Sequence, residues 1–142
     1  MATARIRVAA VLAVALVVNA AGCKDEGERL APVGGVLTVQ AKPVPNGTVT
    51  FYPDAAKGNA TQHQPCGVVA ADGRFELFVP GGRKGAPPGW YKVVVYAVDD
   101  PQPGKPNRYW VNTKYATPSA TLLSVEVVEN PEPGRYDRQL DR

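Results

Sequence analysis

Few side chains in this sequence are of the types that carry out nucleophilic, proton-transfer or metal-binding chemistry. The 142 residues include two cysteines and a single histidine. His63 precedes Cys66 by three residues, a spacing that suggests either a thiol with its base or two metal ligands. A catalytic thiol also needs an oxyanion site, and a structural zinc ion needs four ligands. We therefore expect His63 to be a solvated loop residue, and the sequence predicts no catalytic residues, no metal and no cofactor.

The carboxylates do not form a recognisable metal site either. Asp99 and Asp100 are the only adjacent acidic residues after position 31. A calcium site needs six or more oxygens, commonly from an Asp-x-Asp-x-Asp-Gly spacing, which is absent here. We expect this pair to end a strand in front of Pro101.

Residues 1–22 have the three-part pattern of a secretory signal peptide. Arg5 and Arg7 form a basic start, and the next 11 residues, Val8 to Val18, are all apolar. A membrane-spanning helix needs about 20 apolar residues, so this stretch is too short for a comfortable anchor. Small residues follow it, as signal peptidases require beside the cleaved bond.

Cys23 follows these small residues directly, and AAGC at 20–23 resembles the lipobox of bacterial lipoproteins. Ala20 stands where leucine is more usual in that family. The resemblance implies cleavage between Gly22 and Cys23, diacylglycerol on the Cys23 thiol, and acylation of the new amino group, commonly with palmitate. Two or more acyl chains anchor stably, since each buried methylene contributes about 0.8 kcal/mol. The alternatives are an ordinary signal peptide with Cys23 incidental, or a retained helical anchor.

Residues 23–31 are expected to form the lipidated Cys and a short flexible tether, because KDEGERLA at 24–31 is charged and has no apolar periodicity. In well-studied diderm bacteria an Asp after the lipidated Cys favours the inner membrane. Lys24 occupies that place, so the predicted location is the cell envelope, at the periplasmic face of the outer membrane.

The charge gives no indication of nucleic-acid binding. Two of the 16 Lys and Arg lie in residues 1–22, against none of the 13 Asp and Glu, so the remainder carries a net charge of only +1. Its basic residues are scattered and form no run that could follow a phosphate backbone.

Residues 32–142 have the length of one domain and the pattern of an all-β fold. The 14 Gly and 14 Pro of the chain fall between short runs of Val, Thr, Tyr and Phe, as in a sandwich or barrel. No stretch after Val18 has useful helical periodicity. The predicted strands lie at 33–40, 48–53, 66–80 (as a hairpin), 89–100 and 121–129, with 135–140 as a segment that closes an edge.

The hairpin at 66–80 is the clearest local signal. Asp72-Gly73 supplies the positive φ angles of a tight turn, and Phe75, Leu77 and Val79 share a face, so we expect a hairpin in the core. Cys66, at its start, is expected to be a small buried hydrophobe. An intermolecular disulfide is the alternative.

Two longer segments complete the pattern. The run at 89–100 is so rich in β-branched residues that we expect a central strand covered on both sides. Residues 101–119 hold turn-forming residues and aromatics, and such a long excursion is either disordered or functional. At 121–129, alternation places Leu123, Val125 and Val127 inward.

The order of these motifs resembles the carboxypeptidase regulatory-like, transthyretin-like domains of many small bacterial lipoproteins. Asp72-Gly73-x-Phe75 matches the hairpin of that family, and Pro88-Gly89-x-Tyr91 matches the start of its long strand. The resemblance implies a single seven-stranded Greek-key β-sandwich. Its related hydrolases need several histidines, so that activity is excluded. The matching stretches are 34–53, 67–78, 87–97 and 114–127.

Four aromatic residues are the candidates for recognition: Trp90, Tyr109, Trp110 and Tyr115. Exposed aromatics stack on sugars or anchor protein partners, whereas aromatics in small sandwiches most often serve the core. We therefore expect a non-enzymatic, lipid-anchored structural or binding module. The alternative is a carbohydrate-binding accessory domain, and the expected partner is an envelope protein or a glycan. Edge strands leave open a homodimer.

Overall fold

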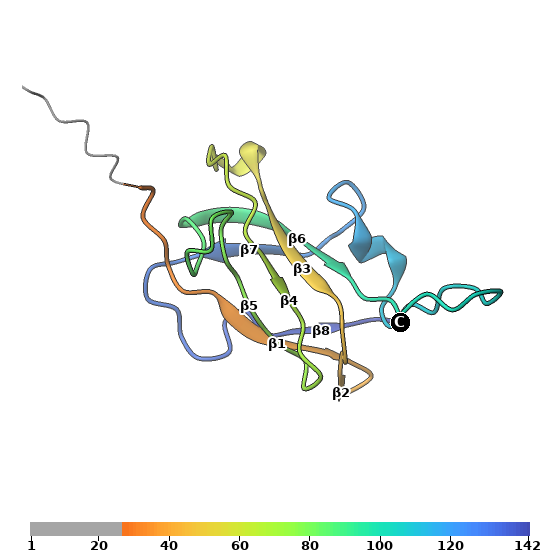
Figure 1. Cartoon of the computed structure of the whole chain (residues 1–142). Helices are drawn as coiled ribbons and strands as arrows, with labels where there is room; N and C mark the ends of the chain where they lie inside the picture. The colour runs from red at the N-terminus through yellow and green to blue at the C-terminus, as the bar shows by residue number, and fades with distance from the viewer. Residues whose placement is uncertain (1–26) are drawn as a thin grey trace, which may run out of the picture.

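The computed structural model describes residues 27–142, and nearly all of their regular structure is β-strand (Figure 1). This confirms the all-β prediction. The predicted signal segment and Cys23 lie outside the described residues. The strands are β1 (Gly34–Val39), β2 (Lys42–Pro43), β3 (Thr48–Pro53), β4 (Cys66–Val68), β5 (Arg74–Glu76), β6 (Gly89–Tyr96), β7 (Ser124–Val127) and β8 (Arg138–Leu140), with 3-10 turns η1 (Ala55–Lys57) and η2 (Thr113–Ala116).

The strands form two sheets. One is antiparallel, in the order β4-β3-β6-β7. In the other, β1 pairs with β2 and β5 on one edge and with β8, in parallel, on the opposite edge. The Leu37 amide donates to Gly73 O at 2.8 Å and its carbonyl accepts from Val44 N at 3.0 Å. Both groups of one strand residue point to the same edge, so β5 and β2 lie end to end along β1.

The core lies between the two sheets and is built by alternation along the strands. In β3, Val49 and Phe51 are buried while Thr48 is exposed, as predicted. Tyr91 of β6 is fully buried, and its hydroxyl donates to Pro87 O at 2.6 Å. Burial raises the pKa of the Tyr91 phenol. The inward positions of 121–129 are also confirmed, because Val125 and Val127 are buried and Leu123 packs against them.

β6 is the central strand of its sheet, as predicted, but it is not covered along its whole length. Its inner face is buried, and on its outer face Val94 is also only 7% exposed. Lys92 and Tyr96, on the same outer face, are exposed. The expectation of cover on both sides therefore holds only around Val94, and outside the sheets η2 is an element that packs against β6.

The predicted hairpin at 66–80 is present, but its two arms belong to different sheets. Ala70 N donates to Arg74 O at 2.8 Å across the turn, and Gly73 has a φ of 81°. At the open end, Cys66 and Phe78 exchange two backbone bonds of 3.0 and 2.9 Å. Between these points β4 pairs with β3, whereas β5 pairs with β1. The hairpin therefore joins the sheets rather than lying within one.

The chain ahead of β1 contacts the body through Glu28, Arg29 and Ala31. The Glu28 carboxylate accepts from Thr61 Oγ1 at 2.7 Å, and Arg29 pairs with Glu129 at 2.8 Å. Ala31 is buried and exchanges two backbone bonds with Ala86. Residues 28–31 of the predicted tether thus have partners on the body, and the flexibility of 23–31 stays a prediction.

The segment 135–140 closes an edge as predicted, and its first two side chains cover a second one. β8 lies beside β1, and the buried Tyr136 hydroxyl accepts from Val128 N at 3.2 Å. Arg135 Nε donates to Glu126 O in β7 at 3.2 Å. Side chains thus occupy the outer edge of β7, a common protection against strand-to-strand pairing.

Candidate binding face

The four candidate aromatics do not form one site. Trp90 is the second residue of β6, whereas Trp110 N donates to Ala97 O just beyond the other end of that strand. With a rise of about 3.3 Å per residue, the two ends are about 20 Å apart. Tyr109 lies beside Trp110, bridged to Val98.

Each tryptophan has one ring face under a cation. Lys57 Nζ lies 4.2 Å from the Trp90 ring centroid, and Arg108 lies 4.9 Å from that of Trp110. Trp110 Nε1 also donates to Asp99 Oδ1 at 2.6 Å. Asp99 thus holds the loop after β6. Both rings are half-buried, so neither offers an open stacking platform.

Tyr115 is a structural residue of η2. It is 5% exposed, and its hydroxyl donates to Asp141 Oδ2 at 3.1 Å. Lys114 Nζ donates to the same carboxylate oxygen at 2.6 Å. Asn112 N donates to Asp141 O at 2.9 Å. These bonds fasten the C-terminal residues to η2.

Tyr109 is the one candidate aromatic with an exposed ring, and its neighbour is a residue that the sequence analysis did not single out. Tyr109 is 37% exposed and Tyr96 is 43% exposed. Their rings meet edge to face, with centroids 6.2 Å apart. Alternation along 89–100 places Tyr96 on the outward side with Lys92, a signal that could have identified it.

Tyr96 belongs to an uncharged patch on the outside of the β4-β3-β6 sheet. Directly paired residues point to the same face of a sheet. Thr48 pairs with both Val68 and Tyr96, and Thr50 pairs with Cys66, which in turn bridges Phe78. We call these six residues the outer face: Thr48, Thr50, Cys66, Val68, Phe78 and Tyr96.

The outer face is exposed and lacks any charged side chain. Val68 is 75% exposed and Phe78 is 38% exposed. The next row along the strands, Tyr52 and Lys92 with Ser124, contains the first charge. A chain with 20% charged residues thus leaves two consecutive rows of the sheet without one, although Val94, beside Thr50 in the second row, is covered. Loss of charge at the centre is a property of protein interfaces.

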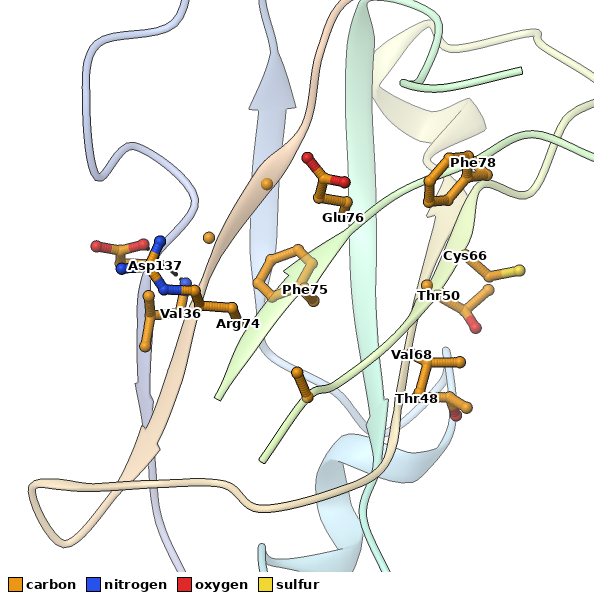
Figure 2. A pocket seen from close by; sticks show the side chains of 14 residues that line it. Val36, Thr48, Thr50, Cys66, Val68, Arg74, Phe75, Glu76, Phe78 and Asp137 are labelled. Carbon is orange, nitrogen blue, oxygen red and sulfur yellow. Dashed lines mark hydrogen bonds between the residues drawn. The ribbon is translucent and has the colours of Figure 1, made fainter. Parts of the chain in front are cut away.

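A groove of about 950 Å³ extends from the outer face across β5 to β1 (Figure 2). Gly34, Gly35 and Gly67 leave the floor without side chains, and a Cβ at Gly67 would overlap the Glu76 carbonyl. In Figure 2 Thr48, Thr50, Cys66 and Val68 line one side, with Val36, Arg74 and Asp137 opposite.

The charges on the rim of this groove are matched within the chain. Arg74 pairs with Asp72 at 3.3 Å, and Lys84 pairs with Glu76 at 2.9 Å. Asp137 Oδ1 accepts from Val36 N at 2.8 Å. The rim therefore presents two ion pairs, and Asp137 adds a carboxylate that is held by a backbone amide.

Cys66 is exposed, which contradicts the expectation of a buried thiol. The reason lies in the orientation of β4. Gly67, between Cys66 and Val68, is the residue that turns inward, where it packs against the backbone of Glu76. Its two neighbours on the strand must then point outward.

The remaining candidates form no metal or catalytic cluster within residues 27–142. His63 is partly exposed, with Nε2 3.4 Å from Glu28 Oε2. Among the described residues no group of three or more His, Cys, Asp or Glu could hold a metal ion, and no helix is long and apolar enough to cross a membrane. No family model, curated protein or solved structure matches the chain. The geometry is suited to binding through apolar contact and hydroxyl groups.

The clamp around Asp141 predicts a pH-dependent stability. Hydrogen bonds from Lys114 and Tyr115 lower the pKa of the Asp141 carboxyl below 3.8, and the bond to Asp141 raises the pKa of Lys114 above 10.5. Because the carboxyl pKa is lower in the folded chain than in the unfolded chain, the Asp141 bonds stabilise the fold at pH values above the unfolded pKa. This stabilisation is lost as the pH falls through the folded pKa. The Lys114 contribution is lost only as pH rises through its raised pKa.

We therefore expect Asp141→Asn to lower the thermal unfolding midpoint at pH 7 and to flatten its fall between pH 5 and pH 2. Gln139→Asn changes an exposed residue of β8 two positions before Asp141 and serves as the control. Equal pH profiles for Asp141→Asn and the unmodified chain would contradict the clamp.

Proposed function

We propose that this chain is a lipid-anchored cell-envelope protein without enzymatic activity, whose β-structured body binds a protein partner through the outer face. The observation that carries the proposal is the uncharged, exposed double row formed by Thr48, Val68, Tyr96 and their neighbours. The largest uncharged, apolar patch on a monomeric protein is often a functional site.

The lipobox-like AAGC supports the anchoring half of the proposal, together with the contact of Glu28 with the body. Only four residues separate Cys23 from Glu28, whose carboxylate is held by Thr61. An extended chain covers at most about 3.5 Å per residue, so the body would stand within about 20 Å of the lipid. Lys24 favours the periplasmic face of the outer membrane as the location.

We also assign the body to the seven-stranded Greek-key arrangement of the transthyretin-like domains. The motif order in the sequence supports this assignment. So does the size of β2, which has two residues and forms one arm of the tight turn after β1, leaving seven longer strands.

The anchoring is tested by the intact mass of the protein extracted from membranes of a lipoprotein-processing bacterium. We expect a chain that begins at Cys23 and carries the added mass of diacylglycerol and one further acyl group. A Cys23→Ser variant should appear in the soluble fraction or keep residues 1–22. Recovery of unmodified protein that starts at Met1 and stays soluble would refute the anchor.

A second candidate function, glycan binding, is favoured by the exposed edge-to-face pair of Tyr96 and Tyr109, with the Thr48 hydroxyl beside it. Aromatic rings beside hydroxyl groups suit the apolar faces and hydroxyls of a sugar.

If glycan binding is the function, the double change Tyr96→Ala and Tyr109→Ala should weaken retention on a peptidoglycan or glycan array by about tenfold or more. Tyr52→Ala removes a ring from the adjacent charged row and should leave retention unchanged. Absence of retention of the unmodified protein on any glycan would remove this candidate.

A further inference from the structure

We infer that the partner of the outer face is a second copy of this chain anchored in the same membrane, packed face to face about a twofold axis. The inference rests on the proposed anchoring, because orientation and confinement by the membrane are part of the argument. It goes further by naming the partner, the symmetry and the residues at the centre of the contact.

The position of the anchored end determines where the outer face points. Glu28 contacts Thr61 and lies 3.4 Å from His63, and Asn59 of the same loop bonds to Trp90 O at the start of β6. β6 therefore leads away from the membrane-proximal end and β3 leads back toward it, so Tyr96, the last residue of β6, lies at the distal end of the strand. When the strands run along the membrane normal, the outer surface of the sheet is perpendicular to the membrane plane. It then faces neighbouring molecules on the same membrane.

The charge pattern favours a partner without a strong net charge. The outer face has no charge, and the residues around it form pairs of opposite sign: Arg74 with Asp72, and Lys84 with Glu76. A strongly acidic or basic partner would gain nothing at such a rim. A second copy brings the same uncharged centre and the same internally paired Arg74 and Lys84.

A twofold axis satisfies the membrane constraint. Two copies related by an axis along the membrane normal place both Cys23 anchors on the same side and bring one surface against itself. Cys66 lies in the middle of its row, between Phe78 and Thr50. Such an axis through the outer face therefore brings the two Cys66 thiols close to each other.

The size of the outer face explains why anchoring matters. The outer face is four strand positions wide, with about 4.8 Å between neighbouring strands, and two rows long, with about 7 Å between rows. Its area is therefore roughly 300 Å², whereas a standard interface buries about 800 Å² on each partner. Association in dilute solution should therefore be weak. Confinement to one membrane raises the effective concentration without any new contact.

Cross-linking through the Cys66 thiol tests the inference on the full chain. Membranes that hold the protein are treated with a short bis-maleimide reagent, and a Cys66–Cys66 linked dimer is expected by gel and by peptide mass spectrometry. Val68→Asp, which places two carboxylates in the contact, should lower the dimer fraction about tenfold. Gln139→Asp, an equal charge change at an exposed position of β8, should not.

The variant Cys66→Ser separates this inference from the proposed function. If Cys23 carries lipid, Cys66→Ser has no free thiol and gives no dimer. A dimer that persists in Cys66→Ser reports a free Cys23 and refutes the anchor instead. The self-association is overturned if the unmodified chain gives no Cys66–Cys66 link, if it links only to another protein, or if Val68→Asp links as well as the unmodified chain.

Discussion

The close approach of β4 to β5 is the constraint on which the rest of the structure depends. Gly67 packs against the Glu76 carbonyl with no room for a Cβ, and the paired Cys66 and Phe78 fix the arms of the hairpin at its open end. One arm completes the sheet of β3 and β6, and the other completes the sheet of β1. A single local hairpin therefore holds two sheets in register around the core.

This junction also creates the surface that we assign to binding. Because Gly67 must face inward, Cys66 and Val68 must face outward, and their partners Thr48, Thr50 and Phe78 extend the same uncharged face to β3 on one side and to Phe78 on the other. The glycine floor of the groove arises from the same close packing of backbones. Structure and proposed function thus depend on the same few residues.

The sequence predicted the strands well because alternation is a local property. The period of two placed Val49 and Phe51 inward, and Asp72-Gly73 marked the correct turn. Alternation does not say which sheet a strand joins, so the division of the hairpin between two sheets was not predicted. That division depends on contacts between residues far apart in the chain.

The errors at individual residues have the same physical origin. Cys66 was expected to be buried from its residue type, but the orientation of β4 is decided by Gly67. Residues 28–31 carried no periodicity that could predict their contacts with distant partners such as Thr61 and Ala86. Gln40 and Ala41 turn the chain with φ of 50° and 60°, a conformation that neither residue type suggests.

Amide hydrogen exchange at Cys66 and Phe78 tests the central claim most directly, because their two mutual bonds join the sheets. The account predicts that both amides exchange as slowly as that of Val93 in the central strand, since opening them requires the sheets to separate. Exchange of both amides as fast as that of Lys105 in the exposed loop after β6 would contradict it.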